Sequence, residues 1–258
     1  MENTKPLEGN GTPTTCAPRL AVSDFREVIA RRYPHWADEP SASDEEQAKQ
    51  HAQAERHQQM RERQDAVHAF LRTVGTRYQD CRLENFEATL PAQKAAVARL
   101  SDYRDSLPDQ VLAGNGIVLY GGAGSGKDHC LIGLARKAIA KYGMSIGWTN
   151  GADLFARFRD SMDADTTEAR IVKQYTTPRI LILSDPVPAR GQLTDFQSAT
   201  LLRIVDARYR ACRPTWCSMN VSSSREADDT IGAALTDRLR HGALCLHFDW
   251  PSYRRAML

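Results

Sequence analysis

Seven consecutive residues near the middle of the chain have the composition and spacing of a phosphate-binding loop. They are Gly121, Gly122, Ala123, Gly124, Ser125, Gly126 and Lys127. An apolar stretch typical of a strand, residues 117–120, precedes them, and a helical pattern follows. Glycines let backbone amides turn toward phosphate oxygens, the helix N-terminus is positively polarised, and the lysine reaches the β and γ phosphates. The sequence predicts a nucleotide site comprising this loop with Asp128 and His129.

The residues expected to hold a magnesium ion beside this loop depart from the usual pattern. The position after the lysine is normally Ser or Thr, whose hydroxyl binds Mg²⁺, whereas this chain has Asp128. The apolar strand predicted at residues 179–184 ends in Ser184 and Asp185, so a serine occupies the usual first acidic position. The changes are complementary, and our hypothesis is that Asp128 and Ser184 exchange roles, with Asp185 beside them. The alternative is that they arose separately and weaken the magnesium site.

Two polar residues at strand ends are candidates for catalysis. Asp185 stands where ATP-hydrolysing proteins with this loop keep the acidic residue that positions the attacking water. An aspartate is shorter than the more frequent glutamate, so we expect slow hydrolysis. Asn220 closes the apolar strand predicted at residues 215–219, where its amide can hydrogen-bond a phosphate or a water. The alternative for Asp185 is a carboxylate that caps a turn before Pro186. The alternative for Asn220 is a simple turn residue.

The elements that must position these residues alternate along the chain. Strands are predicted at residues 117–120, 145–149, 179–184, 215–219 and 244–248, and helices at residues 129–142, 151–162, 194–210 and 233–239. Such alternation predicts an α/β fold with a parallel sheet and helices on both faces.

Length and composition exclude several classes of protein. The chain has 258 residues, 41% of them hydrophobic, and a formal charge of +2, which is too small by itself to indicate a nucleic-acid or membrane-surface protein. Residues 1–110 carry a net charge of −3 and residues 111–258 one of +5. No apolar run is long enough to span a membrane and no secretion signal is visible, so we expect a cytoplasmic protein. The six scattered cysteines are expected to be free and mostly buried, without a zinc site.

The chain before residue 76 differs in character from the rest. Residues 1–18 are polar and predict a disordered leader, and residues 19–75 predict a helical arm. A short helix is expected at residues 22–33, and a capping box at residues 43–46 starts a long helix that ends near Val74. The first half of that helix is almost entirely polar. It is either a solvated helix that leads into the core or an arm that binds a partner.

The order of these motifs resembles the DnaC/IstB-like AAA+ ATPases, the bacterial helicase loaders and transposition helpers. The similarity covers residues 77–255 and includes the lead-in at 77–86 and the ending at 248–255, which is more similar to the loader branch. The resemblance implies that Asn220 is the polar sensor of the γ-phosphate. It also implies that Arg238, in the Asp-Arg-Leu element at 237–239, is an arginine finger for a neighbouring subunit. The alternative for Arg238 is an ordinary ion pair.

This resemblance implies a homo-oligomer that binds ATP and Mg²⁺ and acts on DNA through a partner. Loading of a replicative helicase is the first choice, and help to a transposase is the second, with the arm choosing the partner. The resemblance leaves little room for a separate lid domain. A nucleotide-binding adaptor without turnover and a small-molecule kinase are the alternatives from other classes.

Contact with single-stranded DNA is expected on the helix at residues 151–162. Phe155, Arg157, Phe158 and Arg159 combine rings that stack on bases with cations that pair with phosphates. The spacing of the two phenylalanines fits a buried helix face equally well, so burial in the core is the alternative.

Overall fold

The computed structural model of the chain describes residues 28, 31–33, 42–160, 168–188 and 191–254. The chain divides into two compact units, Met1–Arg56 and His57–Leu258, and the second unit contains the sheet and the phosphate-binding loop. The predicted leader and most of the short helix predicted at residues 22–33 lie outside the described residues.

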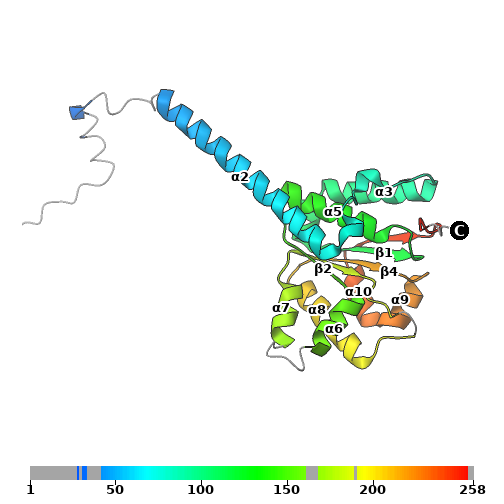
Figure 1. The fold of residues 1–258 in the computed structure, drawn as a ribbon. Helices are drawn as coiled ribbons and strands as arrows, with labels where there is room; N and C mark the ends of the chain where they lie inside the picture. Colours follow the sequence, from blue (N-terminus) through cyan, green and yellow to red (C-terminus); the bar gives the residue numbers. More distant parts are fainter. Residues whose placement is uncertain (1–27, 29–30, 34–41, 161–167, 189–190, 255–258) are drawn as a thin grey trace, which may run out of the picture. The chain divides into compact units, whose positions relative to one another are not determined.

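A five-stranded parallel sheet forms the centre of the second unit (Figure 1). The strands are β1 (Ile117–Gly121), β2 (Ile146–Asn150), β3 (Ile180–Ser184), β4 (Thr215–Met219) and β5 (Leu244–Phe248). Their order across the sheet is β2-β3-β4-β1-β5. Because every pair is parallel, the carboxyl ends of all five strands meet at one edge, where open α/β sheets bind ligands. The predicted α/β fold class is confirmed.

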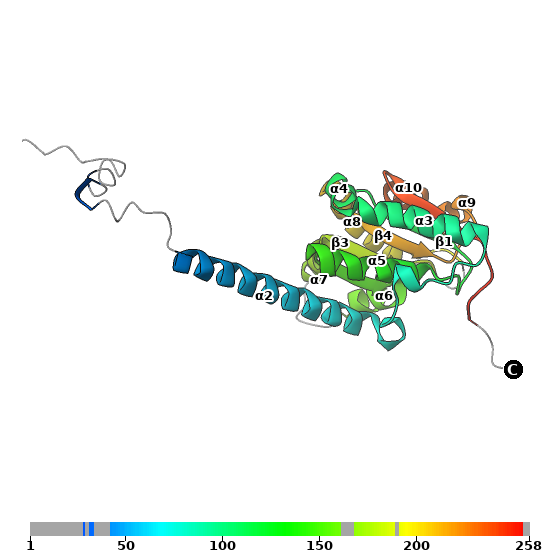
Figure 2. The same ribbon diagram turned by 90° about the horizontal axis from the view of Figure 1, so that it is seen from above.

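Helices cover both faces of this sheet (Figures 1 and 2). One face carries α3 (Pro91–Asp105), α4 (Leu107–Ala113) and α5 (Lys127–Tyr142), and the other carries α6 (Gly151–Asp160), α7 (Glu168–Thr176), α8 (Asp195–Arg210), α9 (Ser224–Ile231) and α10 (Ala233–Arg240). Strand side chains alternate between two cores, as a pleated strand requires. On β3, Ile180 and Ile182 join the core with α5, while Leu181 and Leu183 join the core with α8.

The long helix α2 (Ala42–Val74) changes character along its length. Residues 45–62 are exposed, whereas Val67, Phe70, Leu71 and Val74 are buried in the core that includes α5. The end of α2 is therefore part of the second unit, and the boundary between the units falls at Arg56 rather than at the predicted residue 75.

Local signals explain where two of the helices start. Thr194 caps α8, because its hydroxyl accepts a hydrogen bond from the Gln197 amide and the Gln197 side chain accepts one from the Thr194 amide. Ser223 caps α9 through the Glu226 amide, 3.1 Å from its hydroxyl. These caps fix the starts of the helices that follow β3 and β4.

The amino-terminal edge of the sheet is held by a buried cation, Arg208 of α8, which is 0% exposed. Its guanidinium donates to the carbonyls of Tyr175, Pro178, Arg179 and Pro214 and to the hydroxyl of Thr215. These acceptors flank β3 and β4, so one side chain joins the end of α7 to the starts of two central strands.

All five predicted strands and the four predicted sheet-flanking helices are present, with described ends that differ by two residues or fewer. The sequence did not predict α3, α4, α7 and α9. Helix α3 buries Gln93 and Ala96 beside Leu100 and Tyr103, a face too mixed in polarity to stand out as an apolar stripe. Within the described part of the chain, no helix follows β5 before Arg254.

No helix among the described residues is long and apolar enough to cross a membrane. The five described cysteines are free: Cys81, Cys130 and Cys217 are buried, and Cys212 and Cys245 are exposed. The sixth, Cys16, lies outside the described residues.

Candidate nucleotide-binding site

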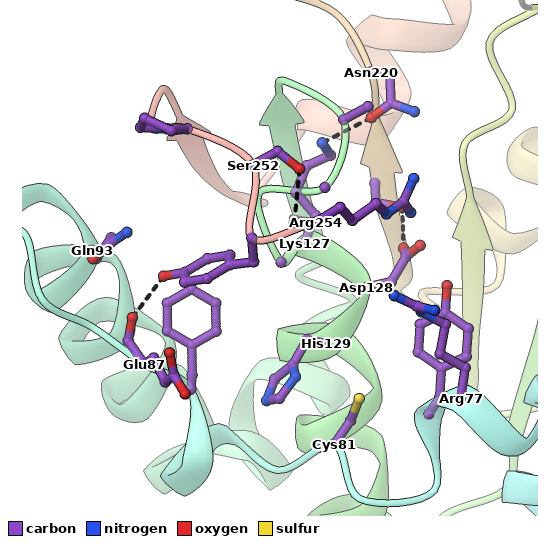
Figure 3. A pocket seen from close by; sticks show the side chains of 18 of the residues that line it. Arg77, Cys81, Glu87, Gln93, Lys127, Asp128, His129, Asn220, Ser252 and Arg254 are labelled. Carbon is purple, nitrogen blue, oxygen red and sulfur yellow. Dashed lines mark hydrogen bonds between the residues drawn. The ribbon is translucent and has the colours of Figure 1, made fainter. Parts of the chain in front are cut away.

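The phosphate-binding loop connects β1 to α5 at the carboxyl edge of the sheet (Figure 3). Geometry requires glycine at several positions of the loop, and two of them show the reasons. Gly124 has φ +78°, and a Cβ there would lie 2.1 Å from the Ser252 hydroxyl; Gly126 has φ +93°, and a Cβ there would lie 2.5 Å from the Phe86 ring. The loop is thus shaped by left-handed backbone and by close approach to segments that are far away in the sequence.

Lys127 begins α5 and is only 6% exposed. Its ammonium donates to the carbonyls of Gly121 and Gly122, each at 2.8 Å, and to the Asn220 side-chain oxygen at 2.9 Å. Burial lowers the pKa of this ammonium, and the carboxylates of Asp128 and Asp185 oppose that shift. Phosphate oxygens can replace these neutral acceptors, as the predicted role of Lys127 requires.

Asp128, the second residue of α5, points toward the ends of β3 and β4 (Figure 3). One carboxylate oxygen accepts from the Ser184 hydroxyl at 3.0 Å, and the other accepts from the Ser218 hydroxyl at 2.6 Å. The two serines face each other in register across β3 and β4, on the face that carries α5. The structure therefore brings the two exchanged residues, Asp128 and Ser184, into direct contact.

Asp185 and Asn220 form a pair just beyond the ends of β3 and β4. The Asn220 backbone amide donates to one Asp185 oxygen at 3.2 Å, and its side-chain amide donates to the other at 2.6 Å. Burial raises the pKa of Asp185, and the two hydrogen bonds from Asn220 oppose that shift. Since Asn220 also accepts from Lys127, a chain of hydrogen bonds links the phosphate loop to Asp185.

A cavity of about 920 Å³ opens beside the loop. Its walls include residues between 77 and 93, a stretch that contains the lead-in, and residues 251–254 after β5. The second wall is fixed by Tyr253, whose amide donates to the Gly124 carbonyl at 2.9 Å and whose hydroxyl donates to the Glu87 carbonyl at 2.6 Å. Arg77 and Arg254 line the cavity and add positive charge (Figure 3).

His129 lines the same cavity and also holds one of its walls. Its Nε2 lies 2.8 Å from the Arg82 carbonyl oxygen and 2.9 Å from the side-chain oxygen of Asn85. Its ring packs edge-on against Phe86. These contacts tie α5 to the lead-in segment.

Arg238 lies outside this cavity, on α10. Its guanidinium forms an ion pair with Asp206 of α8 at 2.9 Å and donates to the Ala234 carbonyl. Within its own subunit Arg238 therefore has the ion-pair arrangement given above as the alternative, and its role toward a neighbouring subunit stays a prediction.

Helix α6, on which contact with single-stranded DNA was predicted, buries both of its phenylalanines. Phe155 and Phe158 are 5% and 2% exposed and belong to the core with α8, so the prediction that these rings stack on bases is wrong. Both rings lie on the buried face of α6 because their spacing matches the helical repeat. Arg157 and Arg159 are exposed, and a role for them in DNA binding stays a prediction.

Sequence reasoning missed the role of Ser218 and the contacts of Tyr253 and Arg254 at the cavity. A signal for Ser218 existed, since it lies two residues before Asn220 on a strand and so shares its face. No comparable signal places residues 251–254 against the loop, because that contact depends on the path of the chain after β5.

The residues at the loop fit a magnesium ion better than a zinc ion. Among the described residues, no group of three or more His, Cys, Asp or Glu side chains is placed to hold a metal. Asp128, Ser184 and Ser218 supply oxygen atoms alone, and Mg²⁺ typically takes one or two carboxylates together with waters and substrate phosphates. The donor set is compatible with Mg²⁺ next to bound phosphates.

The parallel sheet and the loop define an α/β P-loop protein of the AAA+ class. A family model described as "IstB-like ATP binding protein" matches residues 37–257, which is most of the sequence. The chain therefore belongs to the family of IstB-like ATP-binding proteins. No curated protein matches it.

Solved structures with a similar fold include several replication proteins. The DnaC helicase loader is 19% identical, with a TM-score of 0.61 over 67% of this chain and 99% of that one. DnaI is 18% identical, with a TM-score of 0.54 over 68% and 91% of the two chains. The replication initiator DnaA, bound to AMPPCP and single-stranded DNA, is 18% identical, with a TM-score of 0.54 over 67% and 50%. At these identities the likeness is one of fold.

Proposed function

We propose that this protein is an ATPase that works as a homo-oligomer and loads a replicative helicase onto DNA. The observation that carries the proposal is the hydrogen-bond chain from Lys127 through Asn220 to Asp185 at the phosphate loop. It joins a phosphate-binding cation, a polar group near the γ-phosphate position and a carboxylate for the attacking water. Membership of an ATP-binding family supports the choice of nucleotide.

The amides of the loop and the N-terminus of α5 bind the phosphates of ATP. Lys127 exchanges its bonds to the loop carbonyls and to the Asn220 oxygen for bonds to phosphate oxygens, and the side-chain amide of Asn220 donates its second N–H to the γ-phosphate. Asp185 uses its remaining lone pairs to orient the attacking water. Bound Mg²⁺ would neutralise charge on the β and γ phosphates, and Asp128, Ser184 and Ser218 are the residues that would hold it.

Arg238 contributes to hydrolysis from a neighbouring subunit in this proposal. Its side chain is 32% exposed and shares Asp206 with Arg210, so one bond can be given up while the acid stays paired. A cation that reaches the next subunit's nucleotide makes hydrolysis depend on assembly.

The partner and the DNA are assigned from weaker observations. The exposed polar residues 45–62 of α2 present a surface for a partner protein, and the fold is shared with the DnaC helicase loader. Arg157 and Arg159 are the residues proposed to contact the phosphates of single-stranded DNA, without stacking of the buried rings. The matched family's IstB-like description favours a second candidate function, help to a transposase.

The central test is steady-state ATP hydrolysis at increasing concentrations of the full-length protein, with and without single-stranded DNA. We expect the specific activity to rise with concentration and to fall at least about tenfold in Arg238→Ala. Arg203→Ala, an exposed arginine on α8, is the control. Activity that is independent of concentration and survives Arg238→Ala would favour a small-molecule kinase. Nucleotide binding without turnover would indicate an adaptor.

The choice of partner needs a separate experiment. The full-length protein is mixed with the replicative helicase or the transposase of the same cell, and complexes are detected by gel filtration with ATP present. Binding of the helicase alone supports loading. Binding of the transposase alone transfers the proposal to the second candidate.

A further inference from the structure

The position of Asp128 places a fixed carboxylate next to the phosphate-binding loop. The residue directly follows Lys127 in the first turn of α5. Both its oxygens accept hydrogen bonds, at 3.0 Å from Ser184 and 2.6 Å from Ser218, and these two serines are 5% and 2% exposed. Because the hydroxyls that hold it are buried, the carboxylate is not free to swing away from the site (Figure 3).

A carboxylate at this position changes the charge that meets a nucleotide. In the usual loop the side chain after the lysine is a neutral hydroxyl. Among the described residues that line the cavity, the Lys and Arg side chains are Arg77, Lys127 and Arg254, and the carboxylates at the phosphate end are Asp128 and Asp185. Asp128 therefore offsets much of the attraction that Lys127 supplies, and it repels phosphate oxygens in a partly desolvated site.

The same carboxylate is a good ligand for a divalent cation. With the two serine hydroxyls it presents hard oxygen atoms beside the loop, the chemistry that Mg²⁺ and Mn²⁺ prefer. A cation held there cancels the repulsion and adds an attraction of its own for phosphate.

We propose that Asp128 makes nucleotide binding depend on a divalent cation, so that this chain accepts the metal complex of ATP or ADP and rejects the metal-free nucleotide. A loop with Ser or Thr at this position has no carboxylate directly after the lysine, because its acidic residue stands at the end of the neighbouring strand, where this chain has Ser184. The inference rests on the nucleotide binding contained in the proposed function. It adds that the site binds the metal complex of the nucleotide and not the metal-free form.

The test measures binding of a fluorescent ADP analogue to the full-length protein by anisotropy, in MgCl₂ and in EDTA. The proteins compared are the wild type, Asp128→Ser, Asp128→Asn and a control, Asp109→Asn, which removes an exposed acid from the first turn of α4. Asparagine keeps the size of aspartate and can hydrogen-bond both serines. Thermal unfolding without nucleotide verifies that each variant is folded.

We expect the wild type and Asp109→Asn to bind the analogue in MgCl₂ and at least about tenfold more weakly in EDTA. For Asp128→Ser and Asp128→Asn, the affinities in the two buffers should agree within about threefold. Equal affinity of the wild type in both buffers, or a metal dependence of Asp128→Asn as strong as that of the wild type, overturns the inference. So does a wild type that binds in neither buffer while the two Asp128 variants bind in both.

Failure of the proposed function gives a different result. If the wild type and all variants are folded and bind the analogue in neither buffer, the loop is not a nucleotide site, and the proposed function fails together with the inference. Binding by the wild type with equal strength in both buffers removes only the inference.

Discussion

Two buried cations at opposite edges of the same sheet serve different purposes. Lys127, at the carboxyl edge, donates to two loop carbonyls and to the side-chain oxygen of Asn220, and the cavity opens beside it. Arg208, at the amino edge, is 0% exposed and bonds five acceptors that belong to the ends of α7, β3 and β4. The partners of Lys127 lie at the cavity, where a ligand can replace them, whereas the partners of Arg208 are four backbone carbonyls and the Thr215 hydroxyl at the amino edge of the sheet.

The comparison shows that burial and hydrogen bonds alone do not identify a functional cation. The acceptors of Lys127 include the side chain of Asn220, which itself donates to Asp185. All three residues line the cavity. The acceptors of Arg208 are four backbone carbonyls and the Thr215 hydroxyl, and one of these carbonyls, that of Pro214, also accepts from the Leu181 amide. In the proposed function the first cation binds phosphate, whereas the second donates to backbone carbonyls at the amino edge of the sheet.

Removal of the first cation should produce the largest effect. Lys127→Ala is expected to lower ATP hydrolysis by about 100-fold or more, because the transition state loses a fixed positive charge. The free energy of unfolding should change by less than about 1 kcal/mol, since the partners of Lys127 face a cavity that water can enter. Lys137→Ala, an exposed lysine on the same helix, is the control for both measurements. Unfolding of Lys127→Ala would put both cations in the structural class.

Removal of the second cation should act on stability instead. Arg208→Met leaves buried carbonyls without donors and is expected to reduce the free energy of unfolding by about 3 kcal/mol. Arg210→Met, two residues along and 73% exposed, should cost less than about 1 kcal/mol. Urea unfolding followed by circular dichroism measures both. If Arg208→Met does not fold, Arg208→Lys, which keeps the charge but fewer donors, should fold with intermediate stability. Equal midpoints for the methionine variants would contradict the comparison.

A smaller effect is expected where the loop meets the segment after β5. Gly124→Ala places a methyl 2.1 Å from the Ser252 hydroxyl at φ +78°, so the Ser252 side chain must move and the backbone is strained, at a cost of about 1–2 kcal/mol. Gly122→Ala is the matched control, because a Cβ there meets nothing within 4 Å. Denaturant unfolding of the two variants measures the difference. A Gly124→Ala protein as stable as Gly122→Ala would show that the wall of the cavity is not held against the loop.

The smallest effect concerns Asp185, whose pKa burial raises above the ordinary 3.8. For an acid, a raised pKa in the folded state means that the folded protein binds more protons there than the unfolded chain, so stability falls as pH rises above 3.8 through the folded pKa. As pH rises from 3.8 through the folded pKa, we expect the free energy of unfolding of the wild type to fall relative to that of Asp185→Asn. Denaturant midpoints at a series of pH values measure it, and a difference that does not change with pH would contradict the assignment.

Most of the fold could be predicted from sequence because its strands are short apolar runs between helical patterns. Residues 215–219 and 244–248 were predicted with the ends that β4 and β5 have in the structure. Helices α7 and α9 were missed, because each has nine residues or fewer and buries only two described side chains. Phe155 and Phe158 show that a recognisable pattern can still be ambiguous. Their spacing on α6 fits both a buried face and a stacking surface, and only the structure shows that they are buried.

The sequence by itself determined the phosphate loop, because its glycines and Lys127 lie within seven consecutive residues and their chemistry depends on local backbone geometry. It also indicated that Asp128 and Ser184 belong together. Only the tertiary structure decided that Ser218 completes this contact and that Tyr253 fixes a wall of the cavity. Those contacts join segments separated by 90 residues or more, so they depend on sheet order and chain path, which local sequence does not encode.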